Sequence, residues 1–183
     1  MSLHRPFETS ETLLVILTGA SGSGKTTIAK RCSELSPALS VQHFDSIAVP
    51  SVEQMIKTHG SVEEWQRQKT LEWFEKLASC KAKRILFEGQ SRIRFLQEAI
   101  SENNIKAARI ILVDCADAIR SERLAVDRGQ PELANTDMMS WAAFLRQEAD
   151  TVGCEILDTS QITVDAAAQA VLQHFTEREH LDL

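Results

Sequence analysis

Eight consecutive residues near the start of the chain have the types and spacing that phosphate binding requires. They fit G-x-x-x-x-G-K-[ST], the Walker A pattern, in which small residues let backbone N–H groups curl around a phosphate chain. Lys25 is expected to reach the β- and γ-phosphates of a nucleotide, and the Thr26 hydroxyl to bind Mg²⁺. The predicted nucleotide-binding residues are Gly19, Ala20, Ser21, Gly22, Ser23, Gly24, Lys25, Thr26 and Thr27.

Two acidic residues are candidates for the chemistry that a bound nucleotide needs. Mg²⁺ shared by the β- and γ-oxygens requires a carboxylate near the metal or its water shell, and we assign this role to Glu88. A hydroxyl acceptor also needs a group that takes its proton, and Asp45 is predicted to be this base or an acceptor ligand. For each acid, the alternative is an exposed residue that caps the next helix.

Three arginines are predicted to neutralise the charge that phosphoryl transfer spreads over the equatorial oxygens. Arg120, Arg123 and Arg128 stand at i, i+3 and i+8, so the first two share one face of a predicted helix. They lead into a polar connection that could move as a lid. The alternative is a solvated, charged helix face with Glu122 and Asp127 as partners.

The elements that must position these residues alternate between strand and helix. The apolar run before the Walker A pattern suits a central parallel strand, and the segment after it is compatible with a helix whose dipole favours anions. This context argues against a Gly/Ser-rich turn that binds nothing. Strands are predicted at 13–17, 39–44, 85–87, 110–113 and 155–157, and helices at 27–32, 52–57, 62–78, 93–101, 117–127, 137–149 and 164–175.

Such an alternation predicts an α/β domain with right-handed crossovers and a parallel sheet between layers of helices. Ligands of these sheets gather at the carboxyl ends of the strands. Gly19, Asp45, Glu88 and Asp114 each follow the end of a predicted strand. The candidate residues are therefore expected at one edge of the sheet.

Length and charge limit the classes of function. The chain has 183 residues, which fits one domain, and 43% of them are hydrophobic. Its formal net charge of −6 argues against a broad nucleic-acid or membrane-surface footprint. No apolar run approaches the length of a membrane span. We expect a soluble protein, with residues 1–12 as a disordered lead-in.

The four cysteines, Cys32, Cys80, Cys115 and Cys154, lie far apart in the sequence. They form no C-x-x-C pair, and no histidine stands at ligand spacing, so a zinc site and a disulfide framework are both disfavoured. Reduced thiols in the cytoplasm are the expected state.

Taken together, these residues resemble the P-loop small-molecule kinases of the adenylate kinase and nucleoside monophosphate kinase group, with shikimate, gluconate and uridine kinases as cousins. Residues 86–92, LFEGQSR, are similar to the L-x-D-G-F-P-R motif of the nucleotide kinases. This resemblance implies that Glu88 serves the magnesium side and that Arg92 binds the acceptor. Residues 113–129 resemble the F-D-C-x-E…R-L-x-x-R-G stretch that enters the lid in that group.

Some residues depart from the nucleotide-kinase pattern. Glu88 replaces an aspartate, and Gln90-Ser91 replaces Phe-Pro. The second strand ends in Phe44-Asp45-Ser46, which is closer to the hydroxyl-phosphorylating cousins, where an aspartate orients or deprotonates the acceptor. A nucleotide, a nucleoside and a hydroxyl-bearing metabolite therefore all stay open as acceptors.

The prediction is an ATP- and Mg²⁺-dependent kinase of a small molecule. Its fold is a three-layer α/β/α P-loop NTPase domain over residues 13–183, with five parallel strands in the order 2-3-1-4-5. Acceptor-binding helices are expected at about 52–80 and a short lid at about 128–136. The alternative is a nucleotide-binding regulatory ATPase that acts through a protein partner. A polynucleotide end-kinase would need a basic groove, which the net charge disfavours.

Overall fold

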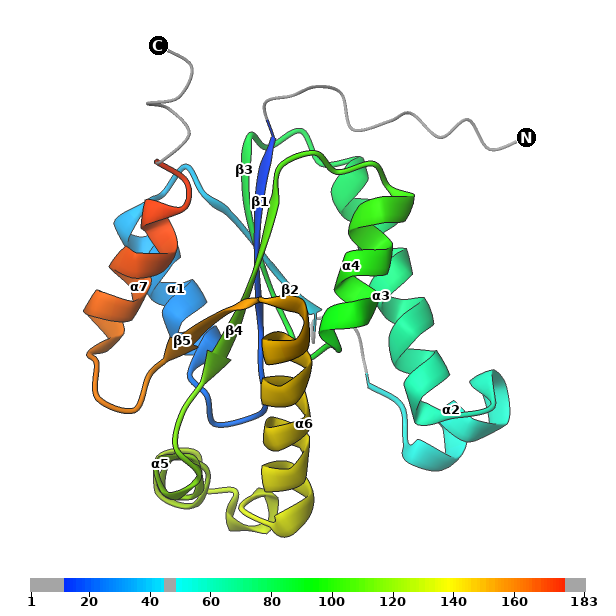
Figure 1. Ribbon diagram of the computed structural model, residues 1–183, viewed down its shortest axis with the longest axis vertical. Coiled ribbons are helices and arrows are strands. Elements are labelled where there is room, and N and C mark those ends of the chain that lie inside the picture. Colours follow the sequence, from blue (N-terminus) through cyan, green and yellow to red (C-terminus); the bar gives the residue numbers. More distant parts are fainter. Residues whose placement is uncertain (1–11, 45–48, 177–183) are drawn as a thin grey trace.

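The computed structural model describes residues 12–44 and 49–176 (Figure 1). The predicted lead-in over residues 1–12 lies outside this part of the chain, except for Thr12. Asp45, the predicted base, also lies outside it. Within the described ranges, no helix is long and apolar enough to cross a membrane.

A five-stranded parallel sheet forms the centre of the molecule, and its strand order is β2-β3-β1-β4-β5. The predicted order is thus confirmed. β1 is buried along its whole length between β3 and β4, as its unbroken apolar sequence requires. The strands are β1 Leu13–Thr18, β2 Ser40–His43, β3 Arg84–Glu88, β4 Ala108–Asp114 and β5 Glu155–Asp158.

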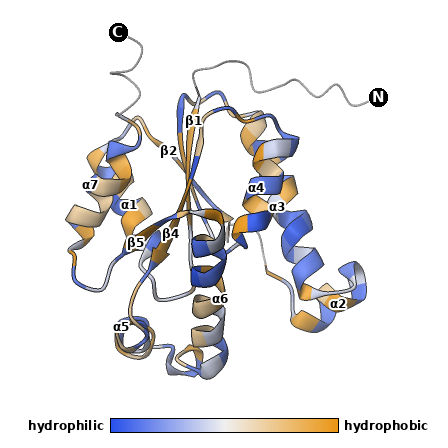
Figure 2. Ribbon diagram, in the orientation of Figure 1, coloured by the Kyte–Doolittle hydropathy of each residue, from blue (hydrophilic) through white to orange (hydrophobic). Residues whose placement is uncertain are grey.

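Helices cover both faces of the sheet, which completes the predicted three layers (Figure 1). Val15 and Leu17 of β1 belong to the core cluster shared with α1 and α7, whereas Leu14 and Ile16 belong to the cluster shared with α3 and α4. In Figure 2 the central strands are largely coloured as hydrophobic and much of α3 as hydrophilic. The helices are α1 Lys25–Leu35, α2 Val52–His59, α3 Val62–Ala78, α4 Ile93–Glu102, α5 Asp117–Glu122, α6 Thr136–Val152 and α7 Val164–Gln173.

The segment between β4 and α6 differs from the single helix predicted at 117–127. The α-helical turns of α5 end at Glu122, and a π-helical segment, η2 Arg123–Asp127, continues them. The N–H of Arg128 donates to the carbonyl of Arg123 at 3.0 Å, the five-residue spacing that defines this wider turn. A short 3₁₀ turn, η3 Pro131–Leu133, then precedes α6 within the predicted lid.

Two capped helices form the region predicted to bind the acceptor. The Ser51 side chain accepts a hydrogen bond from the N–H of Gln54, whose side chain accepts one in return, so a capping box opens α2. Gly60, with φ of 82°, ends α2 in a left-handed conformation. Ser61 then caps α3 through the N–H of Glu64 at 3.0 Å.

Chemical modification of two cysteines, Cys32 and Cys154, can test how the core of the protein is packed. All four cysteines are free. Burial raises the pKa of Cys32 and of Cys154 to about 11, because a thiolate is poorly solvated there. Only the thiolate reacts, so at pH 8 we expect both thiols to be modified by a disulfide reagent at least ~100-fold more slowly in the native protein than after unfolding. Peptide mapping of the labelled sites would check this, and fast labelling of native Cys32 would contradict the described packing.

Candidate active site

The Walker A segment forms a tight loop between β1 and α1. Gly22 and Gly24 have φ of 79° and 99°, a region that other residues rarely adopt. A Cβ atom at Gly19 would lie 2.2 Å from the backbone oxygen of Val113, so only glycine fits there. Lys25 is the first residue of α1, and its Nζ donates to the carbonyl of Ala20 at 3.2 Å. The loop therefore has the closely curled backbone predicted for phosphate binding.

A cavity of about 460 Å³ begins at this loop and extends to the start of α7. Lys25, Thr26 and Thr27 line its polar end. The side chains of Arg123 and Arg128 also line it, so the structure brings two of the three predicted arginines to the same cavity as Lys25. Arg123 is anchored there, because its Nη1 and Nη2 donate to the hydroxyl and the carbonyl of Thr159, each at 2.8 Å.

Sequence reasoning missed the wall that the β5–α7 connection contributes to this cavity. In the structure, the connection and the first turn of α7 contribute two threonines and three apolar side chains to the cavity, a mixture that suits a nucleotide, which has polar phosphates and a largely apolar base. Its position after a strand at the ligand edge was the available signal. The residues are Thr159, Ile162, Thr163, Val164 and Ala167.

Arg120 lies elsewhere than predicted. Its side chain is fully buried, and it is not among the residues that line the cavity. Nη1 donates to the carbonyl of Ser21 at 2.9 Å, and Nη2 binds the carboxylate of Asp114 and the carbonyl of Cys115. Arg146 of α6 donates to the same carboxylate. These contacts make Arg120 a support of the phosphate loop instead of a group at the transferring phosphate.

Glu88 ends β3 beside the loop, and only 3% of the residue is exposed. Both of its carboxylate oxygens lie 3.4 Å from the hydroxyl of Thr26. In nucleotide sites Mg²⁺ is usually held by one or two protein oxygens together with phosphates and water, so Thr26 and Glu88 fit such an ion. Sequence reasoning missed His43, whose Nδ1 lies 2.7 Å from Glu88 Oε1. Its place at the end of β2 was the available signal.

Arg92 lies between α3 and α6. Its Nη1 donates to Gln66 Oε1 at 2.8 Å, and its guanidinium lies 4.9 Å from the ring centre of Trp141 and 5.3 Å from that of Phe144. Desolvation by these neighbours lowers the pKa of Arg92. Its Nε is buried and has no hydrogen-bond partner in the described part of the chain. The side chain is thereby held between α3 and α6, and its Nη2 also lies 3.4 Å from Oε2 of Glu63.

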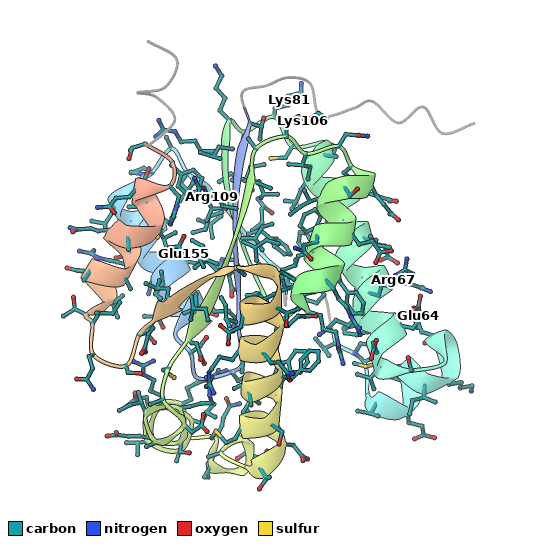
Figure 3. All side chains as sticks on the ribbon, in the orientation of Figure 1. Glu64, Arg67, Lys81, Lys106, Arg109 and Glu155 are labelled. Carbon is teal, nitrogen blue, oxygen red and sulfur yellow. The ribbon has the colours of Figure 1, made fainter. Side chains whose placement is uncertain are left out.

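The base of the predicted acceptor-binding region is fixed to the rest of the domain. Arg67 of α3 donates to both carboxylate oxygens of Glu98 on α4, and it also contacts Glu64 at 3.2 Å (Figure 3). The hydrogen bond from Arg67 lowers the pKa of Glu98. Gln66, one residue earlier, donates to the carbonyl of Gln90 at 3.0 Å. α3 is thereby tied both to α4 and to the segment after β3.

Comparison with known proteins agrees with this architecture. A protein family described as an AAA domain matches residues 15–158. No curated protein matches the chain. Among solved structures, a shikimate kinase from Acinetobacter baumannii in complex with shikimate has a TM-score of 0.62 at 20% identity, covering 94% of this chain and 98% of its own.

Two further solved structures have the same fold. A gluconokinase from Sinorhizobium meliloti 1021 has a TM-score of 0.62 at 15% identity and covers 97% of this chain and 99% of its own. A shikimate kinase from Bacteroides thetaiotaomicron has a TM-score of 0.60 at 14% identity, with coverage of 90% and 98%. The predicted resemblance to small-molecule P-loop kinases is thus confirmed at the level of the fold.

Proposed function

We propose that this chain, which belongs to the AAA domain family, catalyses ATP- and Mg²⁺-dependent transfer of a phosphoryl group to a small molecule. The observation that carries the proposal is the cavity that joins the phosphate loop to the β5–α7 connection. Its lining combines a lysine, two arginines and several threonines with the apolar side chains of Ile28, Ile162 and Val164. The four free cysteines support a reducing compartment such as the cytoplasm.

The residues at the loop have different roles in phosphoryl transfer. Backbone N–H groups of the loop and the ammonium of Lys25 bind the phosphates and stabilise the charge that develops on them. Arg123 and Arg128 add positive charge to the same cavity. Thr26 and Glu88 would hold Mg²⁺, which would neutralise part of the phosphate charge. Chemistry of this type depends on positioning and electrostatics more than on covalent catalysis.

For the acceptor, we propose a small molecule that bears a hydroxyl group. The shikimate kinase of similar fold is in complex with shikimate, and another neighbour is a gluconokinase, which supports this class. Asp45 is then the base that takes the proton of the hydroxyl, and Arg92 binds a polar group of the acceptor. The position of Arg92 just after β3, between α3 and α6, supports this role.

Release of ADP from ATP and Mg²⁺ tests this proposal against a panel of nucleoside monophosphates, nucleosides, sugars, sugar acids and shikimate. We expect a hydroxyl compound to accelerate release. With that acceptor, Asp45→Asn should lower turnover by ~10²–10⁴-fold, the usual contribution of a positioned base, while nucleotide binding is retained. Asp150→Asn, at an exposed position of α6, is the matched control.

Other outcomes of the panel would redirect the proposal. Acceleration by a monophosphate would make Arg92 the clamp for the acceptor phosphate and remove the base role of Asp45. A folded Asp45→Asn enzyme with full turnover would also remove that role. Slow hydrolysis that no acceptor changes would favour a regulatory ATPase acting through a protein partner.

A further inference from the structure

His43 occupies a place beside the metal side of the phosphate loop that the reaction above does not use. It is the last residue of β2 and pairs in register with Glu88, the last residue of β3. Because parallel strands end at the same edge of the sheet, the two side chains meet there. His43 Nδ1 and Glu88 Oε1 lie 2.7 Å apart.

The donor and the acceptor of this hydrogen bond follow from the two groups. A carboxylate accepts hydrogen bonds, so the contact is made by the His43 tautomer that carries its proton on Nδ1 and donates it to Glu88. The Thr26 hydroxyl also lies near, at 3.4 Å from each carboxylate oxygen. Glu88 is buried, and the imidazole lies against one of its two oxygens.

The sheet edge does not depend on this side chain. The backbone of His43 is held by the pairing of β2 with β3. The next residue, Phe44, is 2% exposed, and its ring packs edge-on against Phe87 at 6.3 Å. By contrast, the His43 side chain is 42% exposed, so its contact with Glu88 contributes little to folding stability. What the contact can affect is the orientation of the Glu88 carboxylate.

We propose that His43 is a positioning residue that orients the Glu88 carboxylate toward the Mg²⁺ that accompanies the nucleotide, an inference that rests on the proposed nucleotide-binding function. Residues behind a metal-ligating group fix its orientation, and their loss typically costs 10–100-fold in metal affinity or activity. His43 acts through Glu88 and takes no part in the transfer itself.

A binding titration with a fluorescent ATP analogue tests this without a known acceptor. The affinity is measured in EDTA and across a range of Mg²⁺ concentrations. For His43→Ala we expect the half-saturating Mg²⁺ concentration to rise by ~10-fold or more, with the affinity in EDTA within about twofold of wild type. His43→Asn should recover most of the loss, because its side-chain amide can donate to Glu88 from a position close to Nδ1.

Two reference variants frame the measurement. Glu88→Gln removes the carboxylate charge and sets the largest expected effect. His174→Ala breaks a second histidine–glutamate pair, in which His174 Nε2 and Glu155 Oε1 lie 3.2 Å apart. Glu155, labelled in Figure 3, is the first residue of β5 and so lies at the strand end opposite the edge that carries the phosphate loop, and this variant should leave the Mg²⁺ requirement unchanged.

Three results would overturn the role of His43: a His43→Ala protein with a Mg²⁺ requirement within twofold of wild type, equal losses of affinity in EDTA and in Mg²⁺, or a His43→Asn protein as impaired as His43→Ala. Failure of the underlying function looks different. In that case the wild-type protein binds no analogue, or Lys25→Ala binds it as well as wild type does.

Discussion

Lys25→Ala is expected to lower Mg²⁺-dependent release of ADP from ATP by at least ~10²–10³-fold. Lys25 is 8% exposed and lies at the start of α1, and its ammonium donates a hydrogen bond to the Ala20 carbonyl of the phosphate-binding loop. A charge placed in such a water-poor position stabilises the transition state far more than a charge in water does, and loss of one such donor typically costs ~3–4 kcal/mol in the barrier. Steady-state and single-turnover kinetics, with the acceptor found in the panel, would measure the loss.

Lys30→Ala is the matched control, because Lys30 lies on the exposed side of the same helix. It should leave the rate unchanged. The unfolding midpoints of both variants separate a loss of chemistry from a loss of fold. A folded Lys25→Ala protein that keeps more than a tenth of the wild-type rate would contradict the assignment of Lys25 to the transferring phosphate.

The phosphate loop and its sheet could be predicted from the sequence because each depends on residues that are close together in the chain. An unbroken apolar run, two glycines at a fixed spacing and a lysine are all adjacent in the chain, so their pattern predicts the strand, the loop and the start of α1. The strand order followed from the family resemblance and the alternation of elements. The loop with its sheet and the strand order are properties of the backbone, and many different side chains are compatible with them.

Contacts between distant segments were not accessible in the same way. Arg120 and Arg123 share a helical face by spacing, yet Arg120 packs under the loop and Arg123 lines the cavity. The reason lies in Gly22, where a Cβ atom would come within 3.0 Å of Arg120 Cγ; glycine leaves the space that the arginine occupies. Likewise, the pairing of His43 with Glu88 depends on the register of β2 with β3, which neither strand encodes alone.

Arg120→Ala is expected to reduce the free energy of unfolding by ~3–5 kcal/mol, the usual cost of removing one partner of a buried ion pair. The variant leaves the carbonyl of Ser21 and part of the Asp114 carboxylate without donors, and it empties the space of a fully buried side chain. For a domain of this size we expect the unfolding midpoint to fall by roughly 10 °C. Differential scanning calorimetry and urea titration would measure both quantities.

Arg31→Ala is the matched control for this loss. Arg31 also binds two acids, Glu34 and Asp165, but its side chain is 33% exposed, so solvent screens those pairs and the midpoint should stay nearly unchanged. A double-mutant cycle that combines Arg120→Ala with Asp114→Asn should show a coupling free energy of ~0.5–3 kcal/mol, because the side chains of Arg120 and Asp114 are in direct contact. An Arg120→Ala midpoint within 2 °C of wild type, or additive effects in the cycle, would mean that the loop is supported by other contacts. Because Arg146 of α6 shares the Asp114 carboxylate, a confirmed coupling would also link α6 to the phosphate loop.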